Sequence, residues 1–151
     1  MKYAIILLSL LTVWGGSAWA QEGEKDGQIG PYRVAFMTRA LGLDSEEAKQ
    51  FWPVYEAFKK EQNALNKEKK ALEHSMRQEM LKGDENKIET MADEFVEISR
   101  RQFEVQETYH AKFKEILPIR KVVLLYKAEQ DFNRRLLEEL RKRRQERRGN
   151  K

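Results

Sequence analysis

The 151-residue chain contains no cysteine, only two histidines, and few proline and glycine residues. Without cysteine it has no disulfide bond, no thiolate metal site and no thiol nucleophile. The chain also lacks a glycine-rich phosphate loop, and its few hydroxyl residues are not placed beside an obvious base. Few helix-breaking residues and 36% charged residues favour a helical protein with solvated faces. We therefore predict an all-α protein that is not an enzyme and binds no cofactor.

The first twenty residues have the pattern of a secretory signal peptide. Lys2 precedes an apolar run over residues 4–13, and Ala18-Trp19-Ala20 has the small-x-small form of a cleavage site. The apolar run is shorter than the roughly 20 residues that span a bilayer as a helix. We expect cleavage after Ala20 and export from the cytosol, which makes nucleic acid an improbable partner.

The rest of the chain, residues 21–151, has the length and composition of one helical domain. Residues 21–30 are rich in glycine and charge, and we expect a disordered leader there. Apolar residues then recur at spacings of three, four and seven, which predicts helices over 32–41, 44–81, 85–116 and 119–144. We thus assign a helical domain to 31–144 and a basic tail to 145–151.

The two long helices are predicted to form an antiparallel hairpin. Gly83-Asp84 lies between them and indicates a turn, so that residue n faces a residue near about 166 − n. Pro53 lies inside the first long helix, where its missing N–H predicts a kink or a break. The seam of that helix is predicted at Phe51, Tyr55, Phe58, Leu65, Leu72, Met76 and Met80. The side chains of the last helix that are predicted to face the core are Val122, Leu125, Phe132, Leu136 and Leu140.

The second and the fourth helix begin in a similar way. Leu43 precedes Asp44 and Glu47, which form a close variant of the capping box. Leu117 precedes Pro118, which suits the first turn of a helix. The two segments align at an offset of 74 residues, either through duplication or through chance similarity of amphipathic helices.

With the signal peptide, the size and the missing cysteine, these helix starts resemble the Spy/CpxP-like family of small periplasmic stress proteins. That family is named for a repeated Leu-Thr-x-x-Gln motif, of which only the leucine stands in both copies here. The resemblance implies a periplasmic location and a bent, cradle-like homodimer of helices. It also implies either ATP-independent chaperone activity on unfolded proteins or inhibition of a membrane stress sensor. Other relatives sense or store metal ions.

Several apolar residues lie off the predicted seams, and four thin helices do not enclose all of them. A face that mixes apolar and charged groups suits loose capture of unfolded chains, with charge guiding the encounter. We place such a concave client face near the first two helices and add arginines from the basic end. The predicted client-binding residues are Phe36, Met37, Arg39, Trp52, Arg143 and Arg144.

Two alternative functions stay open at this point. A regulatory module would dock on a membrane sensor protein and control its signal. A metal sensor would use His74 or His110 with neighbouring carboxylates. Two ordinary surface histidines explain the same pattern, and the predicted hairpin places them too far apart to share one ion within a protomer.

Charge is distributed unevenly along the chain. Residues 134–151 contain nine basic and three acidic residues, whereas residues 21–133 contain nineteen basic and twenty-two acidic ones. The net charges of these two parts are +6 and −3. An anionic lipid or an acidic partner surface would suit the basic part, and so would a solvated helix end, where cations are stabilising.

Overall fold

The computed structural model describes residues 30–149, which form four α-helices. In chain order they are α1 (Pro31–Leu41), α2 (Ser45–Lys82), α3 (Glu85–Ile116) and α4 (Ile119–Gly149). The all-α prediction is confirmed, and the first three helices have bounds close to those expected. However, α4 continues past residue 144, so residues 145–149 extend that helix rather than form a separate tail. The predicted signal peptide and nearly all of the predicted leader lie outside the described residues.

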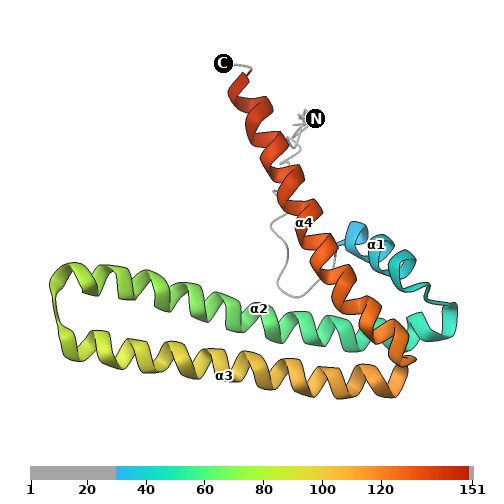
Figure 1. Ribbon diagram of the computed structural model, residues 1–151, viewed down its shortest axis with the longest axis horizontal. Helices are drawn as coiled ribbons and strands as arrows, with labels where there is room; N and C mark the ends of the chain where they lie inside the picture. Colours follow the sequence, from blue (N-terminus) through green and yellow to red (C-terminus); the bar gives the residue numbers. More distant parts are fainter. Residues whose placement is uncertain (1–29, 150–151) are drawn as a thin grey trace, which may run out of the picture.

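The helices α2 and α3 form a long antiparallel hairpin, and α1 and α4 gather at its open end (Figure 1). Gly83 closes α2 with a φ of 81°, a left-handed conformation that glycine adopts without steric penalty. Asp84 then begins α3 by accepting a hydrogen bond from the backbone N–H of Lys87 at 3.3 Å. The sharp turn predicted between the two helices is therefore present.

The register of the hairpin differs by two or three residues from the predicted one. Asn66 accepts a hydrogen bond from Gln102 at 2.8 Å, and Glu68 pairs with Arg101 at 2.6 Å. The predicted rule instead pairs residue 66 with 100 and residue 68 with 98. Helical side chains lean toward the N-terminus of their own helix, so contacts on both helices shift in the same sense. The predicted pairing was based on backbone positions and did not include this displacement of the side chains.

The hydrophobic core lies at the open end of the hairpin, where all four helices meet. The ring of Phe113 lies 5.8 Å from those of both Phe51 and Phe58, and Tyr109 lies 5.3 Å from Phe58. Toward the turn, only a thin line of buried apolar side chains joins α2 to α3. The buried core residues are Met37, Leu41, Phe51, Tyr55, Phe58, Tyr109, Phe113, Leu117, Val122, Leu125, Ala128 and Phe132.

Some of the seam predictions are wrong. Met80 is exposed, whereas Glu79 is only 6% exposed and takes its place in the seam. The buried positions of α2 follow a seven-residue repeat that reaches position 79. Leu136 and Leu140 are also exposed, because α4 has left the body of the molecule before it reaches them (Figure 1).

Pro53 does not interrupt α2, which is continuous from Ser45 to Lys82. Of the two expected outcomes, the break is thus excluded. Pro53 is itself exposed, and the buried aromatic residues on either side of it hold this part of the helix against the core. Tertiary packing here outweighs the loss of one backbone hydrogen bond.

The starts of α2 and α4 lie against one another. Asp44 accepts from the backbone N–H of Glu47 at 2.9 Å, and Glu47 accepts from that of Asp44 at 3.0 Å, which completes the predicted capping box. Lys121 of α4 donates to Glu47 at 2.5 Å and to the carbonyl of Gly42 at 2.7 Å. Glu47 and Lys121 are 74 residues apart. The offset that aligns the two helix starts in sequence therefore also pairs them in space.

Candidate functional site

A cluster of four polar side chains joins α1, α2 and α4 beside the core. Glu129 lies 3.3 Å from both Arg33 and Lys59, and it accepts a hydrogen bond from the hydroxyl of Tyr55. The guanidinium of Arg33 also lies 4.1 Å from the ring centre of Phe132. Burial, and then the charge of Glu129, raise the pKa of Tyr55 far above its usual value. This hydroxyl stays protonated, and the cluster has the character of a structural clamp.

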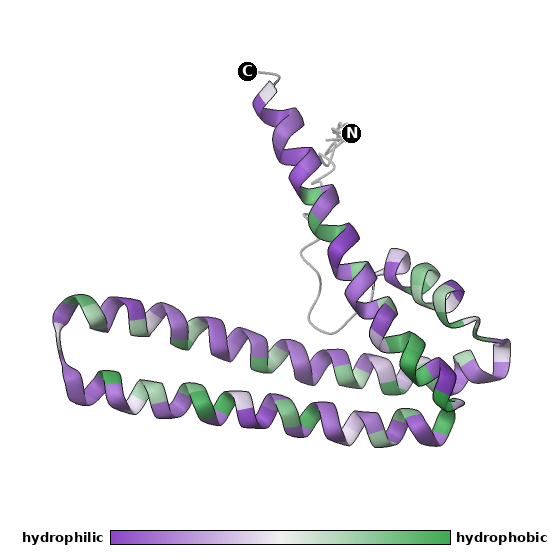
Figure 2. Ribbon diagram, viewed as in Figure 1, coloured by the Kyte–Doolittle hydropathy of each residue, from purple (hydrophilic) through white to green (hydrophobic). Residues whose placement is uncertain are grey.

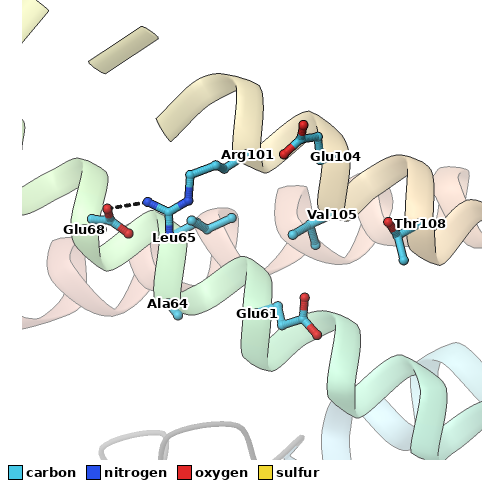
Figure 3. Close-up of a pocket in the computed structure, with 8 residues that line it drawn as sticks. All are labelled: Glu61, Ala64, Leu65, Glu68, Arg101, Glu104, Val105 and Thr108. Atoms are coloured by element: carbon cyan, nitrogen blue, oxygen red, sulfur yellow. Dashed lines mark hydrogen bonds and ion pairs between the residues drawn. The ribbon is translucent and has the colours of Figure 1, made fainter. Parts of the chain in front are cut away.

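A groove of about 360 Å³ lies between α2 and α3 along the hairpin (Figure 3). Three apolar side chains line it together with three carboxylates, one arginine and one threonine. The lining residues are Glu61, Ala64, Leu65, Glu68, Arg101, Glu104, Val105 and Thr108.

Each carboxylate of the groove already has a partner within the chain. Glu68 pairs with Arg101 at 2.6 Å, as the dashed line in Figure 3 shows, and Glu104 pairs with Arg100. Glu61 accepts a hydrogen bond from Tyr109 at 2.6 Å, and burial with this bond raises the pKa of Tyr109 to about 12. The carboxylates of the groove are thus already hydrogen-bonded or ion-paired within the described part of the chain, and we do not assign the groove a reaction.

Both histidines contact neutral side chains. His74 is exposed and lies 2.9 Å from the amide nitrogen of Gln78. His110 of α3 is half-buried, with Nδ1 2.7 Å from the hydroxyl of Tyr126 of α4 and the two rings stacked. Among residues 30–149, no three His, Asp or Glu side chains are grouped so as to hold a metal ion. The geometry therefore gives the metal-sensing alternative no support.

The predicted client-binding residues of α1 and α2 do not share an open face. Met37 is fully buried, so the surface position expected for it is wrong. α1 turns this side chain into the core because it packs against α4. Phe36 is half-buried with its ring 5.5 Å from Phe132, and Trp52 is half-buried with its ring 5.0 Å from Phe51. These side chains complete the core instead of forming the predicted face.

The predicted arginines are exposed, but they lie on two separate helices. Arg39 is on the solvent side of α1, whereas Arg143 and Arg144 are on the end of α4 that projects from the body (Figure 1). Every residue from 133 to 149 is exposed, and this end of the helix is mostly hydrophilic (Figure 2). The residues of the two helix starts have structural roles. Leu117 is buried, Leu43 packs on the core, and Pro118 begins the exposed turn before α4.

Exposed apolar side chains gather instead along α3 and the start of α4. Val96 and Phe103 are 67% and 66% exposed and are seven residues apart, which places them on one face of α3. Ile119 and Val123 are 59% and 61% exposed and share a face of α4. The contact between His110 and Tyr126 joins the two helices between these pairs. We call Val96, Phe103, Ile119 and Val123 the α3–α4 surface.

Comparison with known proteins gives no match. No family model matches the sequence, and no curated protein and no solved structure matches it either. In the part of the chain that the structure describes, no helix is long and apolar enough to cross a membrane.

Sequence reasoning missed the clamp around Glu129 and the α3–α4 surface. Glu129 follows Leu125 by four residues and precedes Phe132 by three, so its position in the inward stripe of α4 is a usable signal. Phe103 also had a signal, because it lies off the predicted seam of its helix, but the predicted client face was placed on the first two helices instead.

Proposed function

We propose that this chain is an exported, ATP-independent chaperone that holds partly unfolded proteins on its α3–α4 surface. The observation that carries the proposal is that these four apolar side chains are each more than half exposed on two helices that contact one another. Single exposed apolar residues are common in folded proteins, whereas a group of them is typical of a contact site. The export follows from the signal-peptide pattern of the first twenty residues.

The chemistry of the surface suits weak and unselective binding. It is an open helical face, so it imposes little selection by shape on the chain that it contacts. Charged side chains border it, among them Arg100, which pairs with Glu97 at 2.6 Å. Such a rim keeps the surface hydrated and assists encounter with charged clients. Because each client makes few contacts, it dissociates quickly, and its release needs no energy from a nucleotide.

The resemblance to the Spy/CpxP-like family supports the same proposal. It rests on the similar starts of α2 and α4 and on the predicted signal peptide, and it implies a periplasmic location. We infer from it that the working form is a homodimer, in which two α3–α4 surfaces would present more contact area to a single client. Sedimentation at several concentrations tests the dimer, and a monomer throughout would contradict it.

A client assay tests the proposal directly. The chain without its predicted signal peptide is added to a chemically unfolded client in the absence of ATP, and light scattering follows aggregation. We expect suppression near a stoichiometric ratio, and weaker suppression by Phe103→Ser. The matched control is Leu81→Ser, since Leu81 is exposed at the hairpin turn, away from the surface.

Two outcomes would contradict this picture. Equal losses in the two variants would remove the assignment to the α3–α4 surface. Absence of suppression with several unrelated clients would remove the chaperone function itself.

The two alternative functions predict different results for the same protein preparation. A sensor-docking module would bind the exported domain of a membrane sensor without protecting clients. A metal sensor would bind zinc or nickel and lose that binding on replacement of His74 or His110.

A further inference from the structure

The far half of α4 has two chemically different sides. Residues 133–149 carry eight basic and three acidic residues. With 3.6 residues per turn, all three glutamates fall on one side of the helix, together with Arg135 and Lys142. The other side carries leucines and arginines and no acidic residue. We call this side the Leu/Arg face, and its residues are Leu136, Leu137, Leu140, Arg143, Arg144 and Arg147.

The Leu/Arg face continues a stripe that is buried in the first half of the helix. Val122 and Leu125 lie on this side of α4 and are 0% and 1% exposed within the core. Leu136 and Leu140 follow at helical spacing, but both are exposed because no other helix accompanies α4 this far (Figures 1 and 2). The stripe thus runs on into solvent, where its apolar side chains have no partner within the described residues.

We propose that the Leu/Arg face binds an anionic phospholipid surface, with α4 lying in the plane of the membrane interface. Interfacial helices bury an apolar side to the depth of the acyl boundary and keep basic side chains at the headgroups. In α4 the three leucines form the apolar side, and the arginines are the basic side chains at the headgroups. Seven of the eight basic residues in 133–149 are arginine, whose planar guanidinium binds phosphate oxygens in a bidentate manner.

Charge complementarity favours lipid over a second copy of the chain. Two α4 ends packed together would bring two positively charged segments into contact, which is unfavourable. Glu139 lies 3.6 Å from Arg143 at the edge of the face, with both side chains more than half exposed. A pair so exposed is weak and yields readily to a phosphate. The proposal does not depend on the proposed chaperone function.

Vesicle binding tests the proposal on the chain without its predicted signal peptide. Co-sedimentation is measured with vesicles of phosphatidylglycerol and phosphatidylcholine in equal parts, and with phosphatidylcholine alone. We expect binding to the anionic vesicles only, weakened by salt. On the anionic vesicles, amide hydrogen exchange should slow in residues 133–149 and stay unchanged in the hairpin.

Two variants with the same change in charge show whether the face matters. Arg144→Glu alters the Leu/Arg face, whereas Lys142→Glu alters the opposite side of the same turn. Both residues are exposed, so both variants should fold, which circular dichroism checks. We expect Arg144→Glu to weaken vesicle binding about tenfold and Lys142→Glu to weaken it much less. Leu140→Ser should weaken binding without any change in charge.

Several results would overturn the proposal. Absence of binding to anionic vesicles would do so directly. Equal losses in Arg144→Glu and Lys142→Glu would show that only diffuse charge attracts the protein to lipid. A Leu140→Ser variant that binds vesicles normally but changes its sedimentation behaviour would assign the leucines to contact with a second copy.

Discussion

Glu129 links three helices through its carboxylate. Its carboxylate accepts from Tyr55 of α2 and pairs with Arg33 of α1 and Lys59 of α2, while Glu129 itself belongs to α4. These side chains are only 12–17% exposed apart from Tyr55, which is fully buried. In such a setting the removal of one partner leaves the others with uncompensated charge.

We expect Glu129→Ala to lower the free energy of unfolding by about 2 kcal/mol, since Arg33 and Lys59 would keep their burial and lose their counter-charge. Urea denaturation followed by circular dichroism measures this change. Glu138→Ala on the exposed part of the same helix is the control and should change the value by less than about 0.5 kcal/mol. Similar values for the two variants would show that the clamp contributes nothing.

Glu79 is a buried carboxylate of a different kind. Its Oε1 atom is buried and has no hydrogen-bond partner among the residues that the structure describes. Lys82 lies 3.3 Å from Oε2 and Lys87 lies 3.8 Å from Oε1, and both lysine side chains are well exposed. The seven-residue repeat of α2 puts this residue in a position that otherwise holds apolar side chains. The carboxylate is therefore poorly solvated and incompletely paired, which is costly.

We predict that Glu79→Leu raises the free energy of unfolding by about 1 kcal/mol, because an apolar side chain fits this position of the seam. Thermal or urea denaturation gives the value. Glu73→Leu on the exposed side of the same helix provides the comparison and should have little effect. A loss of stability in Glu79→Leu would mean that the pairs with the two lysines outweigh the cost of burial.

At the scale of helices, the link between the starts of α2 and α4 depends on one ionised group. The hydrogen bond from Lys121, and then that from the backbone of Asp44, lower the pKa of Glu47 below its ordinary value of 4.5. A carboxyl whose pKa is lower in the folded state stabilises the fold above its unfolded pKa, and this contribution is lost as the pH falls through the folded value.

Glu47→Gln should therefore destabilise the protein at neutral pH and less at pH 3, because the contribution of the ionised carboxyl declines once the pH falls below its unfolded pKa. Urea denaturation of the wild type and the variant at both pH values measures the difference. Glu46→Gln changes an exposed residue that pairs only weakly with Lys49, and its effect should be small at either pH. A Glu47→Gln effect that is independent of pH would contradict the assigned role of the charge.

The sequence predicts the beginnings and ends of helices well because their signals are local. Gly42 and Gly83 have the left-handed conformation that ends a helix, and Asp44 and Glu47 form the capping box that starts one. The failures concern contacts between helices. The hairpin register follows from the lean of helical side chains, and the burial of Glu79 from the seven-residue repeat of α2, and a count of backbone positions and apolar residues leaves both out. The exposure of Leu136 depends on how far another helix accompanies α4, which no window of sequence contains.

At the scale of the molecule, stability is concentrated at one end. Four helices surround the aromatic core at the open end of the hairpin, whereas the turn end is held by two helices and a thin line of side chains. Truncation of a core residue should then be more costly than truncation of an equally buried residue in the hairpin.

We expect Phe113→Ala to lower the free energy of unfolding by about 4 kcal/mol, since its ring contacts Phe51, Phe58 and Tyr109 and would leave a cavity. Leu72→Ala between α2 and α3 should cost about 2 kcal/mol, because water fills the space between two helices more readily than a closed core. Urea denaturation of both variants measures the difference. Equal costs would indicate a core spread evenly along the hairpin.

The projection of α4 also has an electrical consequence for the whole molecule. Residues 134–151, which lie mostly on the projecting end of α4, have a net charge of +6, whereas residues 21–133 have a net charge of −3. The molecule therefore has a permanent dipole moment with its positive pole at the far end of α4. Near any negatively charged surface, the electric field will orient the molecule with this pole toward the surface before the first contact. The rate of association will therefore be sensitive to ionic strength.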